Sequence, residues 1–226
     1  MKILCISDTH NRHEDIIIPE TDMIIHAGDL SSLGKKNEIE LFLKWFSELP
    51  HKHKILIAGN HDFGFETHAQ WCKEIMPDNI NYLNDCGVTI EGLNIWGSPI
   101  TPYFHNWAFN RYRGLNIQPH WDLIPEGTDI IVTHGPAYGF VDELDPHFVR
   151  FGEDRNIGCE DLLYRIEQVK PKLHVCGHIH SNGGIMESNG ETLFVNASVL
   201  NESYIPLRTD PVVIDWVNIN VLIVEN

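Results

Sequence analysis

The stretch Lys54-Ile-Leu-Ile-Ala-Gly-Asn-His-Asp62 joins a short apolar run to a group of polar side chains. Residues 54–58 are mostly aliphatic and a glycine ends the run, which is typical of a buried strand that enters a loop. The loop carries an amide, an imidazole and a carboxylate on Asn60, His61 and Asp62. Binding and catalytic residues gather on loops at the ends of strands. The stretch therefore predicts one strand of a sheet with a functional loop directly after it.

Four further places in the chain have the same form, an apolar run followed by a side chain of a kind that binds metals. Together with Asn60 they supply seven candidate ligands, namely Asp8, His10, Asp29, Asn60, His134, His178 and His180. Oxygen and imidazole donors together suit divalent Mn, Fe, Co, Ni and Zn ions. Seven side chains are too many for one ion, so the set predicts a centre of two divalent cations.

The spacing within these motifs suggests how the side chains converge. Asp8 and His10 are separated by one residue, as are His178 and His180, and alternate side chains of an extended segment face the same way. The glycine before Asp29 permits a tight turn that brings this carboxylate close to its neighbours.

Two ions in such a centre favour the chemistry of phosphate esters. A pair of divalent ions about 3.5–4 Å apart clamps phosphate oxygens and generates a bridging hydroxide near neutral pH, which attacks the ester in line. An imidazole that is not a ligand can protonate the leaving group. His61 is the candidate for this role, and Asp62 is expected to orient it.

The expected secondary structure alternates between strands and helices at first and then becomes mostly strands. Helices are expected at 37–49, 67–76 (with Thr67 as N-cap) and 158–169, and strands at 2–7, 22–26, 54–58, 79–83, 88–90, 93–97, 129–133, 172–176, 184–187, 192–195, 212–216 and 219–224. This order favours two packed sheets with helices outside over one open parallel sheet. No internal repeat or low-complexity linker interrupts the chain, so a single domain over 1–226 is expected.

Residues 98–118 are aromatic and irregular, and two interpretations of them stay open. The segment is either a lid over the site or a loop that packs over a sheet edge. Asn110 and Arg111 in it are candidates for contact with a base or a phosphate of the substrate, because Arg beside aromatic rings suits nucleotides. Loop packing and a surface arginine are the alternative. Residues 140–155 are expected to form a polar loop.

Charge and composition exclude some classes of partner. The net charge of −16 disfavours long nucleic acids and anionic membrane surfaces. No apolar run is long enough for a membrane span or a signal-peptide core. The five cysteines include no C-x-x-C pair, which fits reduced thiols in a cytoplasmic protein. The oligomeric state is left open.

Eight of the remaining histidines are expected to have structural or surface positions. His26 and His174 lie within apolar strands and are interpreted as buried residues that support ligands. The others are expected to be solvated, namely His13, His51, His53, His105, His120 and His147.

The motifs together resemble a known family. Calcineurin-like metallophosphoesterases carry five motifs in the same order as Asp8-Thr-His10, Gly28-Asp29, Gly59-Asn-His-Asp62, Thr133-His-Gly135 and Gly177-His-Ile-His180. Longer stretches, such as Ile25-His-Ala-Gly-Asp29 and Asn196-Ala-Ser198, resemble its metallophosphoesterase-domain-containing, cyclic nucleotide phosphodiesterase-like branch.

The resemblance implies a fold, a ligand assignment and an activity. The fold is a four-layer αββα sandwich of two mixed β-sheets flanked by helices. One ion would take Asp8, His10 and His180, the other Asn60, His134 and His178, with Asp29 bridging and His61 acting on the leaving group. The implied substrates are phosphodiesters such as 2′,3′- or 3′,5′-cyclic nucleotides, and Mn²⁺ is the favoured ion.

Two other functions stay open beside the phosphodiesterase. A non-catalytic scaffold could keep the same fold, although all seven candidate ligands are present here. A phosphomonoesterase or a nuclease for short oligonucleotides would use the same centre, while the negative charge disfavours a long polymer substrate.

Overall fold

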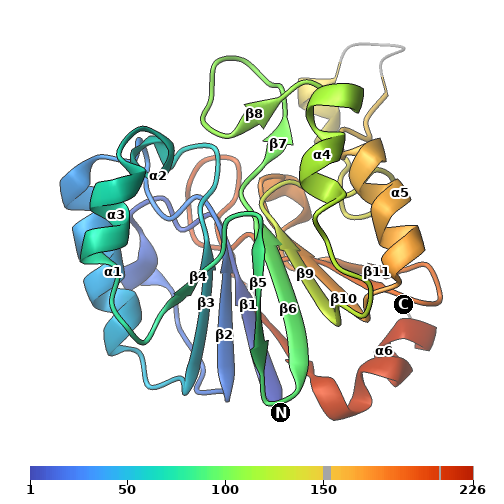
Figure 1. Cartoon of the computed structure of the whole chain (residues 1–226), viewed down its shortest axis with the longest axis horizontal. Coiled ribbons are helices and arrows are strands. Elements are labelled where there is room, and N and C mark those ends of the chain that lie inside the picture. Colours follow the sequence, from blue (N-terminus) through green and yellow to red (C-terminus); the bar gives the residue numbers. More distant parts are fainter. Residues whose placement is uncertain (150–153, 209, 226) are drawn as a thin grey trace.

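Two β-sheets pack face to face in the computed structural model, which describes residues 1–149, 154–208 and 210–225. Helices cover the outer faces of both sheets, so the chain forms four layers in the order helix, sheet, sheet, helix (Figure 1). This arrangement confirms the expected αββα sandwich and the mixed character of its sheets.

The first sheet is built mainly from the N-terminal part of the chain. Its strands, in spatial order, are β13 (Val212–Asp215), β1 (Lys2–Ile6), β2 (Met23–Ala27), β3 (His53–Ile57) and β4 (Asn81–Tyr82). Strands β1 to β4 are parallel, and only β13 runs antiparallel beside β1. The loops after β1, β2 and β3 therefore lie at one edge of this sheet.

The second sheet has a parallel centre and antiparallel edges. Its order is β11 (Met186–Ser188), β12 (Leu193–Asn196), β10 (Leu173–Cys176), β9 (Ile130–Thr133), β6 (Leu93–Ser98) and β5 (Cys86–Ile90). The four central strands are parallel, while β11 and β5 are antiparallel. A bridge between Ser7 and Ser198 joins the end of β1 to the segment after β12.

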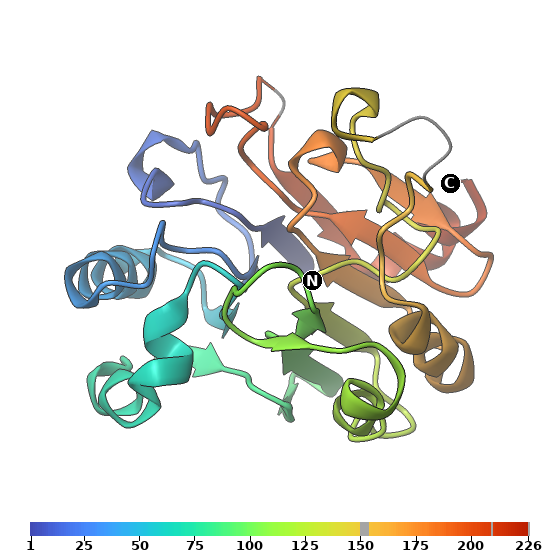
Figure 2. The same cartoon turned by 90° about the horizontal axis from the view of Figure 1, so that it is seen from above.

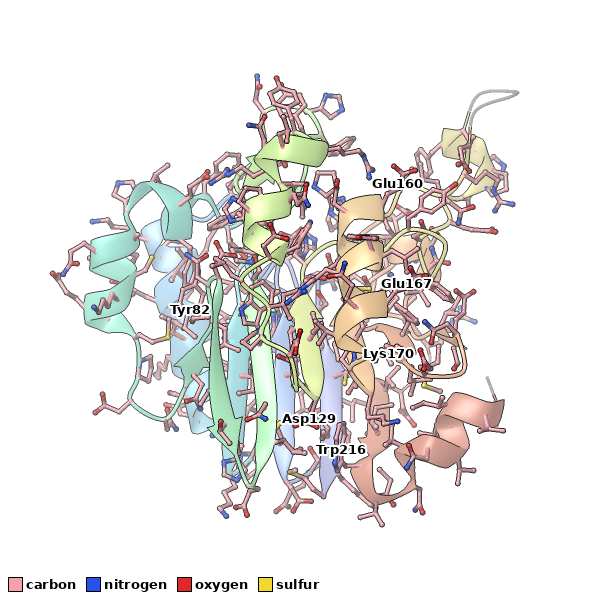
Figure 3. The ribbon with its side chains drawn as sticks, turned by 45° about the vertical axis from the view of Figure 1, so that its right-hand side comes forward. Tyr82, Asp129, Glu160, Glu167, Lys170 and Trp216 are labelled. Carbon is pink, nitrogen blue, oxygen red and sulfur yellow. The ribbon has the colours of Figure 1, made fainter. Side chains whose placement is uncertain are left out.

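Helices α1 to α5 pack on the outer faces of the sheets. Helices α1 (Lys36–Glu48), α2 (Phe63–Thr67) and α3 (Ala69–Ile75) lie beside the first sheet, and α4 (Gln118–Trp121) and α5 (Glu160–Val169) beside the second (Figure 2). Helix α5 ends where Lys170 turns into the left-handed conformation and donates its N–H to the carbonyl of Ile166 (Figure 3). The C-terminal helix is α6 (Ile219–Glu225).

Within the described residues, five single turns of 3₁₀-helix and one small sheet complete the fold. The turns are η1 (His13–Asp15), η2 (Gly114–Asn116), η3 (Pro146–Phe148), η4 (His180–Asn182) and η5 (Trp216–Asn218). Strands β7 (Thr101–Pro102) and β8 (Asn110–Arg111) pair in the aromatic segment. Residues 150–153 of the expected loop at 140–155 lie outside the described residues.

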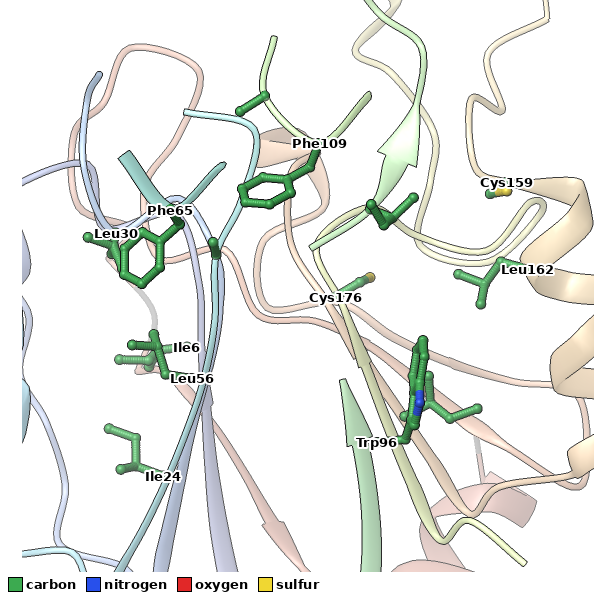
Figure 4. Close-up of a cluster of buried hydrophobic side chains, with 14 of the residues drawn as sticks. Ile6, Ile24, Leu30, Leu56, Phe65, Trp96, Phe109, Cys159, Leu162 and Cys176 are labelled. Atoms are coloured by element: carbon green, nitrogen blue, oxygen red, sulfur yellow. The ribbon is translucent and has the colours of Figure 1, made fainter. Parts of the chain in front are cut away.

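The strands are apolar on both faces because each sheet is covered on both sides. In β1, Ile3 and Cys5 belong to the apolar cluster between the sheets. Leu4 and Ile6 belong to the outer cluster, in which the outer faces of the sheets pack against the helices. Figure 4 shows part of that cluster, with Ile6, Ile24, Leu56 and Phe65 near the first sheet and Trp96 and Leu162 near the second. Burial on both faces explains why these runs do not alternate between apolar and polar residues.

Three expectations about local structure are wrong. Residues 219–224, expected as a strand, belong to α6, where Ile219 and Ile223 are buried at a helical spacing of four. Thr67 is the last residue of α2 and not an N-cap, and its hydroxyl donates to the carbonyl of Phe63. The run at 79–83 contains only the two residues of β4, which pair in parallel with β3.

Within the described ranges, none of the helices has both the length and the hydropathy needed to cross a bilayer.

The Phe42→Ala variant is expected to lower the free energy of unfolding by about 3–5 kcal/mol, because truncating a buried ring leaves a cavity. Phe42 is fully buried and packs on Phe46 with 5.4 Å between the ring centroids. The neighbouring Leu41→Ala variant is the control, since Leu41 is 61% exposed and its loss should cost less than about 0.5 kcal/mol. Chemical denaturation measures both, and similar costs for the two variants would contradict this account of the core.

Candidate metal centre

Five loops converge where the two sheets meet at the carboxyl ends of their parallel strands. Asp8 follows β1, Asp29 follows β2, Asn60 follows β3, His134 follows β9 and His178 follows β10. Backbone hydrogen bonds fix the loops to one another, including one from the N–H of Asp8 to the carbonyl of Gly28 at 2.9 Å. Another runs from Gly177 to the carbonyl of His134 at 2.9 Å.

A first group of candidate ligands contains Asp8, His10 and His180. The Oδ1 atom of Asp8 lies 3.6 Å from Nε2 of His180 and 4.0 Å from Nε2 of His10. All donor atoms of the group lie within 4.8 Å of one another, and the carboxylate of Asp8 is fully buried. A single cation could contact all three donors.

A second group contains Asp29, His134 and His178, again within 4.8 Å of one another. The Nε2 atom of His134 lies 3.3 Å from Oδ2 of Asp29 and 2.8 Å from Oδ1 of Asn60. The amide oxygen of Asn60 is therefore directed at the same point as the second group.

Asp29 stands between the two groups. Besides His134, its Oδ2 atom lies 3.7 Å from Nε2 of His10, which belongs to the first group, and 4.0 Å from Nε2 of His61. The structure thus brings together all seven side chains that the sequence singled out as ligands, and it places His61 beside them.

Contacts behind the ligands fix which ring nitrogen faces the centre. The Nδ1 atom of His134 donates to the carbonyl of Ala27 at 2.9 Å, and Nδ1 of His180 donates to that of Asn201 at 3.0 Å. Each Nε2 is therefore turned inward. On the first carboxylate, Oδ2 of Asp8 accepts from the hydroxyl of Ser198 at 2.7 Å.

The hydrogen bonds of the ring nitrogens test whether these side chains fit cations. In the part of the chain that the structure describes, neither ring nitrogen of His10 has a hydrogen-bond partner, although both are buried. Nε2 of His134 faces two oxygen acceptors, so it needs either a proton or a cation. The residues present therefore fit divalent cations.

Three imidazoles of the centre differ in the direction in which their pKa values are shifted. Burial lowers the pKa of His10 and of His178 to about 4, so both rings offer neutral lone pairs at pH 7. Burial alone would also lower the pKa of His134, but the carboxylates of Asp29 and Asp8 raise it to about 9. His134 in turn holds the pKa of Asp29 below its usual range, although burial acts in the opposite direction.

The backbone geometry corrects the expected reason for this convergence. Asp8 (φ 57°), His10 (φ 40°), Asp29 (φ 54°) and His178 (φ 70°) all adopt the left-handed conformation. Their side chains meet because of these left-handed turns and not because of the two-residue period of a strand. Such values are uncommon outside glycine and gather at functional sites.

Two glycines allow the loops to approach closely. A Cβ atom on Gly177 would lie 2.1 Å from Oγ of Ser7 and 2.2 Å from Oδ2 of Asp8. A Cβ atom on Gly59 would lie 2.3 Å from Oδ1 of Asp29. The carboxylates of the centre occupy the space that any other side chain at these positions would need.

Asp62 has a different position from the expected one. Its carboxylate is fully buried and accepts hydrogen bonds from the N–H groups of Gly59, Leu30 and Ser31 and from the Ser31 hydroxyl. The ring of His61 is instead held by a bond from Nδ1 to the carbonyl of Ser32 at 2.8 Å. Asp62 therefore fixes the loop that carries His61 and does not orient the ring itself.

The two substrate-binding candidates, Asn110 and Arg111, both contact other residues of the chain. The amide of Asn110 donates to the carbonyl of Phe104 and accepts from the hydroxyl of Thr101. Arg111 lies 3.6 Å from the carboxylate of Glu66. These contacts support loop packing, and a role in substrate binding stays a prediction for both residues.

Three aromatic residues near the candidate ligands were not singled out as site residues from the sequence. The ring centroid of Trp107 lies 4.2 Å from that of His61, and that of Phe104 lies 6.2 Å from His178. The ring centroid of Tyr204 lies 4.8 Å from that of His10. Trp107 and Phe104 belong to the segment at 98–118, whose aromatic character was the available signal.

The structural histidines are partly as expected. His26 and His174 are buried and hydrogen-bonded to Thr9 and Thr133, which adjoin candidate ligands, as anticipated. His13 and His51 were expected to be solvated, but both are buried, with exposed fractions of 5% and 2%. His13 packs on aromatic rings of α1, and His51 is bonded to the carbonyl of Pro19.

The Gly177→Ala variant is expected to lower the free energy of unfolding by about 1–3 kcal/mol, because the added methyl group has to displace Ser7 and Asp8. The Gly135→Ala variant is the control, since a Cβ atom there comes no nearer than 3.4 Å to a side chain. Guanidinium unfolding of both variants measures the difference. Equal stabilities would show that the loops around Gly177 yield without cost.

The sequence profile of the calcineurin-like phosphoesterase family matches residues 1–182 of the chain. Metallophosphoesterase domain-containing protein 1 of Homo sapiens and that of Mus musculus are each 40% identical to it over 237 aligned residues, which cover 95% of this chain and 70% of the relative. The phosphopantetheinyl hydrolase PptH of Mycobacterium tuberculosis shares the fold, with a TM-score of 0.61 at 14% identity over 90% of each chain.

These similarities agree with the geometry of the loops. Proteins of this family generally bind divalent metals, and the described structure contains His and Asp groups that could hold them. The profile covers the candidate ligands from Asp8 to His180. The chain therefore belongs to the calcineurin-like phosphoesterase family.

Proposed function

We propose that this chain is a dinuclear metal-dependent phosphodiesterase that hydrolyses small substrates such as cyclic nucleotides. The observation that carries the proposal is the position of Asp29, whose Oδ2 atom lies within 4.0 Å of imidazole nitrogens from both ligand groups. A carboxylate between two groups of donors is suited to bridge two cations.

The proposed ligand assignment follows the two groups. Asp8, His10 and His180 hold one cation, while Asn60, His134 and His178 hold the other, and Asp29 contributes to both. When bound, two such ions act as Lewis acids toward phosphate oxygens and lower the pKa of a coordinated water. Mn²⁺ is the preferred candidate, because it accepts mixed oxygen and imidazole donors.

His61 is proposed to protonate the leaving group. Its Nδ1–H is held by the carbonyl of Ser32, so Nε2 is the atom that can carry a second proton toward the substrate. The ring also packs against Trp107, which limits its rotation. Its Nε2 lies 4.0 Å from Oδ2 of Asp29, so a proton it carries is delivered beside the proposed cations.

The net charge suggests the size of the substrate, and the cysteines suggest the compartment in which the protein works. The net charge of −16 supports a small phosphate ester in preference to a long nucleic acid. All five cysteines are free, four of them buried, which supports a reducing compartment such as the cytoplasm.

Mn²⁺-reloaded protein is expected to bind two equivalents of metal and to hydrolyse bis-p-nitrophenyl phosphate faster than p-nitrophenyl phosphate. Chelator-treated protein should contain no metal and hydrolyse neither ester. The Asp29→Asn variant should lose turnover while its unfolding transition remains, because a neutral amide bridges two cations poorly. Metal analysis and initial rates measure both effects. The Asp122→Asn variant, which changes an exposed aspartate, is the matched control.

Three results would contradict the proposal. Full activity with one metal equivalent would remove the bridging role of Asp29. Turnover of the monoester alone would identify a phosphomonoesterase. Two bound metals without turnover of either ester would favour a non-catalytic scaffold.

The His61→Asn variant is expected to lose about 10²–10⁴-fold in kcat on diesters with poor leaving groups and much less on p-nitrophenyl esters, because a good leaving group needs no proton. A series of aryl diesters with increasing leaving-group pKa measures the effect. The His147→Asn variant is the control, since that side chain is 90% exposed. A loss of equal size across the series would exclude proton donation by His61.

A further inference from the structure

A turn far along the chain brings an aromatic side chain to the centre. In the turn at 201–205, the N–H of Tyr204 donates to the carbonyl of Asn201 at 2.8 Å, and the N–H of Asn201 donates to that of Ile205 at 2.9 Å. The amide oxygen of Asn201 also accepts from the N–H groups of Ser203 and Ile205. The turn is therefore fixed by its own hydrogen bonds.

Three contacts attach this turn to the candidate ligands. His180 donates to the carbonyl of Asn201, and the N–H of Ser181 donates to the carboxylate of Glu202 at 3.0 Å. From the loop after β1, Arg12 donates to the carbonyl of Tyr204 at 2.9 Å. The position of Tyr204 is thus tied to the same segments that carry His10 and His180.

The ring of Tyr204 packs on both imidazoles of the first ligand group. Its centroid lies 4.8 Å from that of His10 and 5.5 Å from that of His180, with edge-to-face angles of 84° and 78°. The side chain nevertheless stays 44% exposed. One part of the ring therefore lines the centre while another part is open to a bound molecule.

The backbone of Tyr204 has a strained conformation. Its φ of 57° lies in the left-handed region, which a bulky side chain rarely adopts. Strain of this kind persists only where surrounding contacts impose it, and it gathers at sites that contact ligands. A second exposed ring, that of Phe104 (50% exposed), lies beside His178 of the other ligand group.

We propose that Tyr204 is a specificity-determining residue whose ring packs against the planar organic substituent of a bound phosphate ester. The proposal rests on the phosphodiesterase function, because it assumes that the phosphate group lies at the two ligand groups. An ester with an aromatic substituent gains contact with the ring, whereas inorganic phosphate or a methyl ester leaves the ring in water. Tyr204 thereby favours diesters that carry at least one planar group.

The binding test needs no turnover and uses Mn²⁺-loaded protein. Calorimetry compares phenylphosphonate with methylphosphonate, neither of which has a hydrolysable ester bond. Wild type should bind the phenyl compound more tightly by about five- to tenfold, and the Tyr204→Ala variant should lose this preference while it binds methylphosphonate and metal as before. The Tyr204→Phe variant should keep the preference, because it retains the ring.

Controls separate contact from folding. The Tyr164→Ala variant removes an exposed tyrosine from α5, and its binding preference should equal that of wild type. The Tyr204→Gly variant relieves the left-handed backbone while removing the ring, so it should behave like Tyr204→Ala if the ring is responsible. In hydrolysis, the Tyr204→Ala and Tyr204→Gly variants should both raise KM for bis-p-nitrophenyl phosphate and leave kcat within about twofold of wild type.

Two binding results would overturn the proposal. An unchanged phenyl preference in Tyr204→Ala would show that the ring does not contact the substituent, and an equal loss in Tyr204→Phe would assign the effect to the hydroxyl. The absence of hydrolysis in wild type would instead refute the phosphodiesterase function, and the phosphonate titrations would still decide the contact of Tyr204 with the substituent.

Discussion

The buried carboxylate of Asp29 is the constraint on which the rest of the structure depends. A buried charge is costly unless it is paired, and Asp29 has three imidazoles within 4.0 Å of one oxygen atom. Those imidazoles come from the loops after β1, β3 and β9, so the ends of both sheets have to meet around one atom. The parallel strands at the centre of each sheet provide this meeting point, since their carboxyl ends share an edge.

Rigid loops are the second requirement of this arrangement. Residues beside the candidate ligands fix these loops, such as Asp62 in the loop after β3 and Ser198, which donates to Asp8. The left-handed residues and the close approach at Gly177 cost stability locally. Two large apolar clusters, one between the sheets and one on their outer faces, offset that cost.

The sequence predicted the fold and the gathering of side chains because both depend on local patterns. An apolar run followed by an Asp or His identifies each loop without reference to the others. The left-handed backbone of His10, the partners of Asp62 and the contact of Tyr204 with His10 depend on neighbours that no short window contains. The bond from Arg12 to Tyr204, for example, spans 192 positions. The misassigned helix α6 is a short apolar run, whose period is ambiguous between strand and helix.

The link between Asp8 and Ser198 has a consequence for the order in which the molecule folds. The two residues are 190 positions apart, and β13 completes the first sheet beside β1 only when residues 212–215 are present. Closing so long a loop is slow, and such contacts form late. During synthesis on a ribosome, the N-terminal strands emerge first and wait with an unpaired edge. The nascent chain thus acquires its centre only after Ser198 has been synthesised, and until β13 follows, aggregation at β1 competes with completion of the sheet.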